Sequence, residues 1–201
     1  GSPAMTFLLG LTGSIGMGKS TTAKLFAEAG CDVWDADAAV HRIYSKGGSA
    51  VEPMRALEPR AVIDDTVSRP SLRALIAEDP TLLVRIEKIV HPLVGQDRQQ
   101  FIDTAQSDIL VFDIPLLFET GGNARMDAVV CVSIPAELQQ KRVMERGTMT
   151  LEQFEQIKAK QMPNDDKVAL SDYVVITDTM DHAREQVQAI VNTIKAGLPH
   201  A

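Results

Sequence analysis

The chain has 201 residues, of which 45% are hydrophobic and 23% are charged, and this composition excludes a protein disordered along its whole length. Asp and Glu outnumber Lys and Arg by 27 to 20, which gives a formal net charge of −7. Because affinity for a nucleic-acid backbone comes from excess basic side chains, this balance argues against a nucleic-acid partner. A phosphate-bearing ligand would need a local device that overcomes the overall negative charge.

Apolar runs and helical periodicity predict strands that alternate with helices. The first strand, helix and second strand fall within about 30 residues, which predicts a parallel β-α-β pair. The predicted strands are residues 6–11, 31–34, 109–112, 128–133 and 173–177. The predicted helices include residues 19–29, 38–44, 135–146, 151–160 and 182–195. The fold class predicted from this order is an α/β sandwich on a five-stranded parallel sheet.

The middle of the chain, between residues 37 and 107, has a different pattern. Several short apolar repeats at helical spacing predict a helical insertion, with prolines at first turns or at joints between helices. Pro92 follows His91, so we expect one helix to end at His91 and another to begin there.

The expected compartment is the cytoplasm, without a membrane partner. The longest apolar stretch, residues 109–118, is far too short for a membrane span. Cys31 and Cys131 lie in separate apolar runs without metal-site spacing, so we expect buried thiols in a reducing compartment. Residues 1–4, which precede Met5, look like an expression-tag remnant.

The segment GSIGMGKS at residues 13–20 fits the phosphate-loop pattern G-x-x-x-x-G-K-[ST], with a predicted strand before it and a predicted helix after it. Such a loop wraps backbone N–H groups around phosphate oxygens, while Lys19 reaches the β- and γ-phosphates and Ser20 ligates Mg²⁺. The expected nucleotide-binding residues are Gly13, Ser14, Ile15, Gly16, Met17, Gly18, Lys19, Ser20 and Thr21. This loop is the local device that an acidic protein needs, because it binds phosphate with backbone dipoles and one lysine.

An ordered set of further motifs resembles the dephospho-CoA kinase family, whereas the guanine-binding and switch motifs of GTPases are absent. The resemblance covers Phe7 to about Val191. The motifs are Asp35-Ala36-Asp37, His91-Pro92, the run from Asp113 to Glu119, Gln139-x-x-Arg142 with Arg146, Lys160-Gln161 and Ser171-Asp172-Tyr173-Val174.

The resemblance implies ATP-dependent phosphorylation of the ribose 3′-hydroxyl of dephospho-CoA to give CoA and ADP, with Mg²⁺ as cofactor. It also implies a fold of the nucleoside-monophosphate-kinase type with three regions. These are a nucleotide-binding core at 5–40 with 108–140 and 170–197, a helical CoA-binding region at 41–107 and a lid at 141–169. The expected state is a monomer or small homo-oligomer.

By this resemblance Asp37 is the catalytic base and Asp35 a weaker candidate for a direct role. The alternative for Asp37 is an N-cap of the helix that follows it. Asp113 ends a predicted strand and is expected to hold Mg²⁺ together with Ser20, although a loop cap is an equal alternative. Glu119 lies near the acceptor in the family, and a solvated carboxylate is the alternative.

Arg142 and Arg146 lie four residues apart and share a helix face. The resemblance places them in the lid, where they would contact the transferred phosphate, with Arg142 the stronger catalytic candidate; the alternative is an exposed, ion-paired helix face. Arg69 and His91 are expected to contact the CoA substrate, or to be a surface arginine and a structural histidine.

The chain departs from the family pattern at residues 57–60, at Ser14, near Val168 and Leu170, and at residues 177–180, although Lys167 remains. Two alternative functions stay open. One is another nucleoside or nucleoside-monophosphate kinase, and the other is a nucleotide-binding regulatory module without turnover.

Overall fold

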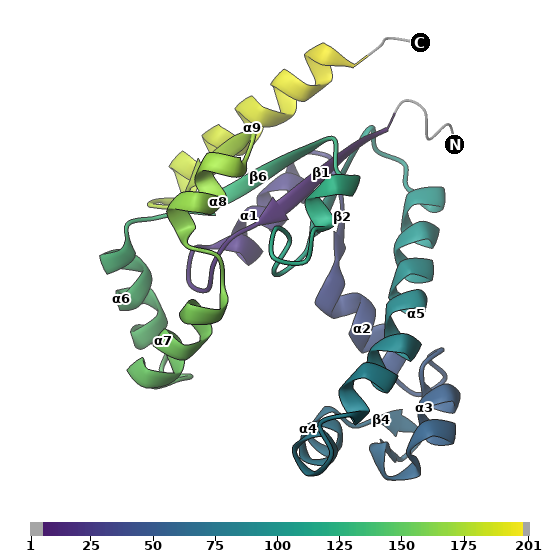
Figure 1. Cartoon of the computed structure of the whole chain (residues 1–201). Coiled ribbons are helices and arrows are strands. Elements are labelled where there is room, and N and C mark those ends of the chain that lie inside the picture. Colours follow the sequence, from purple (N-terminus) through teal and green to yellow (C-terminus); the bar gives the residue numbers. More distant parts are fainter. Residues whose placement is uncertain (1–5, 199–201) are drawn as a thin grey trace. The chain divides into compact units, whose positions relative to one another are not determined.

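The computed structural model describes residues 6–198, so the segment interpreted as a tag remnant lies outside the described residues. The chain divides into two compact units, and Figure 1 labels most of their elements. The first unit contains the described residues up to Trp34 and those from Ala105 onward, and the second contains Asp35–Thr104.

The first unit is built on a five-stranded sheet. Its strands are β1 (Phe7–Thr12), β2 (Asp32–Asp35), β5 (Ile109–Asp113), β6 (Ala128–Ser133) and β7 (Tyr173–Ile176). Its helices are α1 (Lys19–Glu28), α6 (Ala136–Arg146), α7 (Leu151–Lys160), α8 (Asn164–Leu170) and α9 (Met180–Gly197), with a 3₁₀ turn at Gly122–Arg125. The predicted α/β class with a five-stranded parallel sheet is confirmed.

The strand order is β2-β5-β1-β6-β7, so β1 lies at the centre of the sheet. It pairs in parallel with β5 on one side and β6 on the other, and β6 pairs in parallel with β7. The prediction that the first two strands are neighbours is wrong, because β5 lies between them. Apolar patterning shows that a segment is a buried strand but not which strand it pairs with. Because β1 is the central strand, the loop that follows its carboxyl end lies at the middle of the edge where the parallel strands end.

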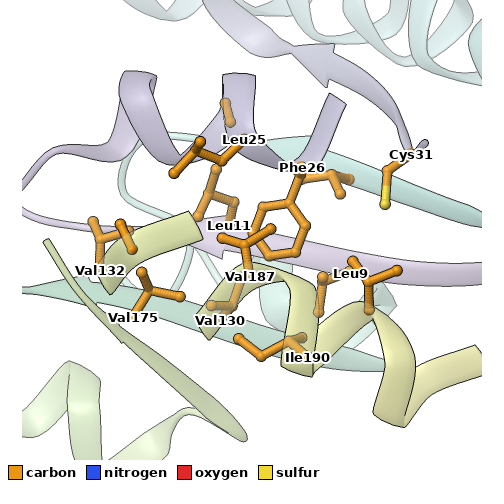
Figure 2. Close-up of a cluster of buried hydrophobic side chains, with 14 of the residues drawn as sticks. Leu9, Leu11, Leu25, Phe26, Cys31, Val130, Val132, Val175, Val187 and Ile190 are labelled. Carbon is orange, nitrogen blue, oxygen red and sulfur yellow. The ribbon is translucent and has the colours of Figure 1, made fainter. Parts of the chain in front are cut away.

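One face of the sheet is covered by α1 and α9 (Figures 1 and 2). Figure 2 shows Leu25 and Phe26 of α1 and Val187 and Ile190 of α9 among the side chains of β1, β6 and β7. Buried residues of α9 recur at helical spacing, from Ala183 through Val187 to Ile194, and the Thr179 side chain caps the helix by accepting the His182 N–H. This apolar packing makes the sheet a rigid support for the loop after β1.

The second unit has its own hydrophobic cluster, which includes Ile43, Met54, Leu72 and Ile86. Its elements are α2 (Ala36–Tyr44), α3 (Val51–Leu57), a 3₁₀ turn (Pro59–Ala61), β3 (Val62–Ile63), β4 (Thr66–Val67), α4 (Arg69–Glu78) and α5 (Leu82–Thr104). The antiparallel β3–β4 hairpin was not predicted, because strands of two residues leave no alternation to detect. Its turn is formed by Asp64 and Asp65, which both have positive φ.

The expected break between helices at His91 and Pro92 is wrong, because α5 continues through both residues. Proline lacks an N–H and disfavours a helix interior. Here the apolar face before and after it, which includes Val90, Leu93 and Val94, packs on the cluster of the second unit. Tertiary packing therefore keeps this helix continuous.

The range expected to be the lid, 141–169, contains most of α6, all of α7 and most of α8, and these helices belong to the first unit. The sequence did not predict α8, which has only seven residues. Within residues 6–198, no helix combines the length and the apolar character that crossing a membrane requires.

Candidate active site

The loop after β1 turns sharply into α1 at two glycines. Gly16 and Gly18 have φ values of 77° and 91°, in the left-handed region that side chains disfavour. A Cβ on Gly18 would also lie 3.0 Å from the Thr177 hydroxyl oxygen. Because α1 begins at Lys19, immediately after Gly18, the free N–H groups at its N-terminus adjoin the loop, as phosphate binding requires.

Contacts from three other segments hold the loop in shape. The Gln139 side-chain amide donates to the Ile15 carbonyl at 2.7 Å, and the Ile15 N–H donates to Gln161 Oε1 at 3.3 Å. The Thr177 hydroxyl donates to the Met17 carbonyl at 2.5 Å. Sequence reasoning gave these three side chains no role, although Gln139 and Gln161 were part of the motif resemblance.

A cavity of about 250 Å³ lies over the loop. It is lined by Gly13, Ser14, Ile15, Gly16, Gly18, Lys19, Ser20, Thr21, Pro115, Arg146 and Gln161. The structure thus brings together most of the predicted loop residues and Arg146, more than one hundred residues away in the chain. Met17 does not line this cavity, because its side chain is buried in the core, where Sδ accepts the Ile134 N–H at 3.2 Å.

Arg142 lines a second cavity, of about 260 Å³, whose other walls include Gly18, Thr21, Arg146 and residues 177–180. Its guanidinium donates to the Thr177 carbonyl at 2.7 Å and to the Asp178 carbonyl at 3.2 Å. Arg146 lines both cavities. Of the two arginines, Arg146 is therefore the one that borders the loop cavity.

Lys19 and Asp113 form an ion pair, with Lys19 Nζ 2.8 Å from Asp113 Oδ1. Asp113 is the last residue of β5, a strand that lies between β2 and β1 inside the sheet, and its side chain is buried. The pair brings the lysine of the loop to the carboxylate predicted to hold a metal.

The side chains present fit Mg²⁺. The described part of the chain has no group of three or more His, Cys, Asp or Glu side chains that could hold a metal ion. Magnesium keeps several waters and takes one or two protein oxygens together with phosphate oxygens. The Ser20 hydroxyl, exposed in the first turn of α1, and the Asp113 carboxylate are hard oxygen donors of this kind.

Glu119 is held by protein groups. Its Oε2 lies 3.2 Å from Nζ of the buried Lys167 and accepts the Met162 N–H at 2.9 Å. Burial alone would raise the pKa of Glu119, but the hydrogen bond from Met162 and the Lys167 ammonium lower it below its ordinary value. The solvated carboxylate that was the alternative for Glu119 does not match this environment.

Asp35 and Asp37 belong to the second unit and have different surroundings. The Asp35 carboxylate caps α2 by accepting the N–H groups of Asp37 at 2.8 Å and Ala38 at 3.2 Å. The alternative in which Asp37 is the cap is therefore wrong, because Asp35 takes that position. Asp37 lies in the first turn of α2 with its side chain exposed.

The other two predicted substrate contacts also lie in the second unit. Arg69 is the first residue of α4, and its guanidinium lies over the Tyr44 ring, 5.6 Å from the ring centre. His91 is exposed on α5. Both side chains occupy positions that a ligand of this unit could reach.

Comparison with known proteins identifies the family. A model of the family described as dephospho-CoA kinase matches residues 7–182. The chain belongs to the dephospho-CoA kinase family. The dephospho-CoA kinase of Ruegeria pomeroyi is 70% identical over 197 residues, which cover 98% of this chain and 100% of that protein.

Solved structures share this fold. The crystal structure of TT1252 from Thermus thermophilus has a TM-score of 0.82 at 29% identity and covers 97% of this chain and 99% of that chain. The dephospho-CoA kinase of Campylobacter jejuni has a TM-score of 0.69 at 23% identity, covers 94% of this chain and 98% of its own, and supports the fold.

Family membership confirms the predictions of family, enzyme class and function: the chain is a phosphoryl-transferring enzyme of coenzyme A biosynthesis that uses ATP. Membership of this kinase family contradicts the alternative of a regulatory module without turnover. The roles of Lys19, its loop and the other individual side chains follow as proposals.

Proposed function

We propose that this kinase transfers the γ-phosphoryl group of ATP to the ribose 3′-hydroxyl of dephospho-CoA. The observation that carries the proposal is the loop cavity, which is lined by glycines of the phosphate loop, by Lys19 and Ser20 at the start of α1 and by Arg146. These groups give an acidic protein a local binding site for a polyanion.

The two cavities divide the nucleotide between them. The loop cavity receives the phosphates, and the cavity lined by Arg142 and residues 177–180 receives the nucleoside, because the two share Gly18, Thr21 and Arg146. Arg146 then reaches phosphate oxygens, where a guanidinium neutralises the charge that develops during transfer. Arg142 borders the nucleoside and keeps its hydrogen bonds to the Thr177 and Asp178 carbonyls.

Lys19 exchanges partners when nucleotide binds. In the structure its ammonium pairs with Asp113, and we infer that phosphate oxygens replace this carboxylate. Ser20 and Asp113 would then hold Mg²⁺, which supplies charge neutralisation for the phosphates when bound. Asp113 thus keeps Lys19 oriented before binding and becomes available to the metal afterwards.

Asp37 is the proposed base. Its carboxylate is exposed and free of the capping role, so it is available to accept the proton of the attacking hydroxyl and to orient that hydroxyl. Since phosphoryl transfer has a largely dissociative transition state, orientation of the nucleophile is a large part of this role. Arg69 and His91 are proposed to contact the CoA substrate, with Arg69 directed at its phosphates.

Composition supports the remaining parts of the proposal. The excess of acidic side chains fits an enzyme without a nucleic-acid or membrane partner. Cys31 and Cys131 are free, buried thiols, which suits the reducing cytoplasm. We propose a cytoplasmic monomer or small homo-oligomer.

The test is an acceptor screen. Purified protein is incubated with Mg·ATP and, in competition, dephospho-CoA, nucleosides and nucleoside monophosphates, and the phosphorylated products are identified by mass. CoA is the expected product. Preferential phosphorylation of a nucleoside or nucleoside monophosphate would contradict the proposal in favour of the alternative kinase.

Lys19→Ala should lower the rate of CoA formation by about 100-fold or more, because the loop loses the charge that contacts the β- and γ-phosphates. The measurement is kcat with dephospho-CoA at saturating Mg·ATP. Lys24→Ala, on the exposed face of the same helix, is the control and should leave kcat within about twofold. A Lys19→Ala variant with nearly full activity would remove the loop from the mechanism.

A further inference from the structure

A buried ion pair of the first unit is given no part in the reaction proposed above. The Lys167 side chain in α8 is 1% exposed, and its ammonium lies 3.2 Å from Glu119 Oε2. Lysine is seldom fully buried without a partner, because its charge loses its hydration. Such a pair contributes little net stability, since apolar side chains of similar size would often serve as well.

The Glu119 carboxylate also fixes the turn that follows α7. The oxygen that faces Lys167 accepts the Met162 N–H at 2.9 Å. Met162 directly follows Gln161, and Gln161 Oε1 accepts the N–H of Ile15 in the phosphate loop at 3.3 Å. An unbroken line of contacts therefore runs from Lys167 through Glu119, Met162 and Gln161 to Ile15.

At the loop end of this line, Ile15 is held from two sides by glutamine side chains, an arrangement we call the clamp on Ile15. Gln161 holds the Ile15 N–H, and Gln139 of α6 holds the Ile15 carbonyl at 2.7 Å. Gln161 also lines the loop cavity, so a shift of its backbone would alter both the wall of the cavity and the shape of the loop. Because the loop binds phosphate through its backbone, its shape sets the affinity for nucleotide.

We propose that Glu119 and Lys167 are a positioning pair: by fixing Met162 they hold Gln161 against Ile15 and thereby set the affinity of the phosphate loop for ATP. This inference rests on the proposed function in that ATP is the ligand of the loop. It accounts for a buried lysine and for a glutamine that the catalytic roles leave unused.

The decisive variant removes both charges. Glu119→Leu/Lys167→Met leaves no unpaired buried charge, so the fold should keep a melting temperature close to that of the unchanged protein. The Met162 N–H loses its acceptor, so the Kd for ATP, measured by calorimetry without acceptor, should rise about fivefold or more.

Gln161→Ala should raise the Kd for ATP by a similar factor. Combined with the double substitution it should add little, because all three changes break the same line of contacts. Arg184→Met is the matched control, since it removes an ion pair with Glu28 that joins α9 to α1 in the same unit, and it should leave the Kd unchanged.

A folded Glu119→Leu/Lys167→Met protein with unchanged Kd would overturn the inference, and so would additive effects in the combined variant. If the double variant does not fold, Gln161→Ala decides alone, and an unchanged Kd overturns the proposal. The ATP affinity of the unchanged protein tests the proposed function separately, because the inference concerns the ratio between variant and unchanged protein.

Discussion

Two aspartates separated by one residue show how the backbone assigns different tasks to identical side chains. Asp35 has extended backbone at the end of β2, which directs its carboxylate to the first N–H groups of α2. Asp37 already lies in the helix, so its side chain has no such partner and remains exposed. The Asp35 carboxylate is thus engaged as the helix cap, whereas the Asp37 carboxylate remains available for the reaction.

Asp37→Asn should lower kcat by about 100-fold or more, because the amide cannot accept the proton of the hydroxyl. Binding of ATP should stay near that of the unchanged protein, as measured by calorimetry. Asp35→Asn is the matched control, since asparagine caps helices as well as aspartate and should keep most of the activity. An Asp37→Asn enzyme within a few-fold of full activity would show that the base lies elsewhere.

At the level of elements, α5 shows tertiary packing prevailing over a local signal. Its 23 residues include Pro92, which costs the helix one backbone hydrogen bond. The apolar residues on both sides of Pro92 pack on the cluster of the second unit, and this burial offsets the loss.

Pro92→Ala should stabilise the protein by about 1–2 kcal/mol, because it restores the helical N–H and is only partly offset by greater freedom of the unfolded chain. Urea unfolding followed by circular dichroism measures the change. Pro70→Ala, at the second residue of α4 where proline is tolerated, is the control and should change stability by less than about 0.5 kcal/mol. Destabilisation by Pro92→Ala would contradict this account of α5.

For the whole molecule, the charge balance combines with burial to set the pH range of stability. Burial alone would raise the pKa of Asp32, but N–H groups of Gln106 and Ser107 donate to its carboxylate and lower that pKa below its ordinary value. Hydrogen bonding lowers the pKa of Glu119 in a similar way. On the alkaline side, burial raises the pKa of the Cys31 and Cys131 thiols to about 11.

Stability should therefore form a plateau between about pH 5 and pH 9. A carboxylate whose pKa is lowered in the fold stabilises the fold at pH values above its ordinary pKa, and this contribution is lost as pH falls through the lowered pKa. A thiol whose pKa is raised in the fold makes its full contribution to stability at pH values below its ordinary pKa, and this contribution is lost as pH rises toward 11. Urea midpoints measured across the plateau and below it test the expectation, which constant midpoints from pH 5 down to pH 3 would contradict.

Local patterns predicted much of this molecule. The glycines and lysine of the loop, the buried strands β5 and β6 and the amphipathic face of α9 each carry a signal within a short window. The hairpin β3–β4 and helix α8 are too short for such a signal, and the continuity of α5 depends on a cluster assembled from distant residues.

The sequence by itself determined the class of fold, the phosphate loop and, through ordered motifs, the family, because these depend on residue types at fixed spacing. Only the tertiary structure decided the strand order, the pairing of Lys19 with Asp113, the burial of Lys167 against Glu119 and the clamp on Ile15. These contacts join residues that lie up to about 150 positions apart, and spacing along a chain does not encode which distant side chains meet when the sheet assembles.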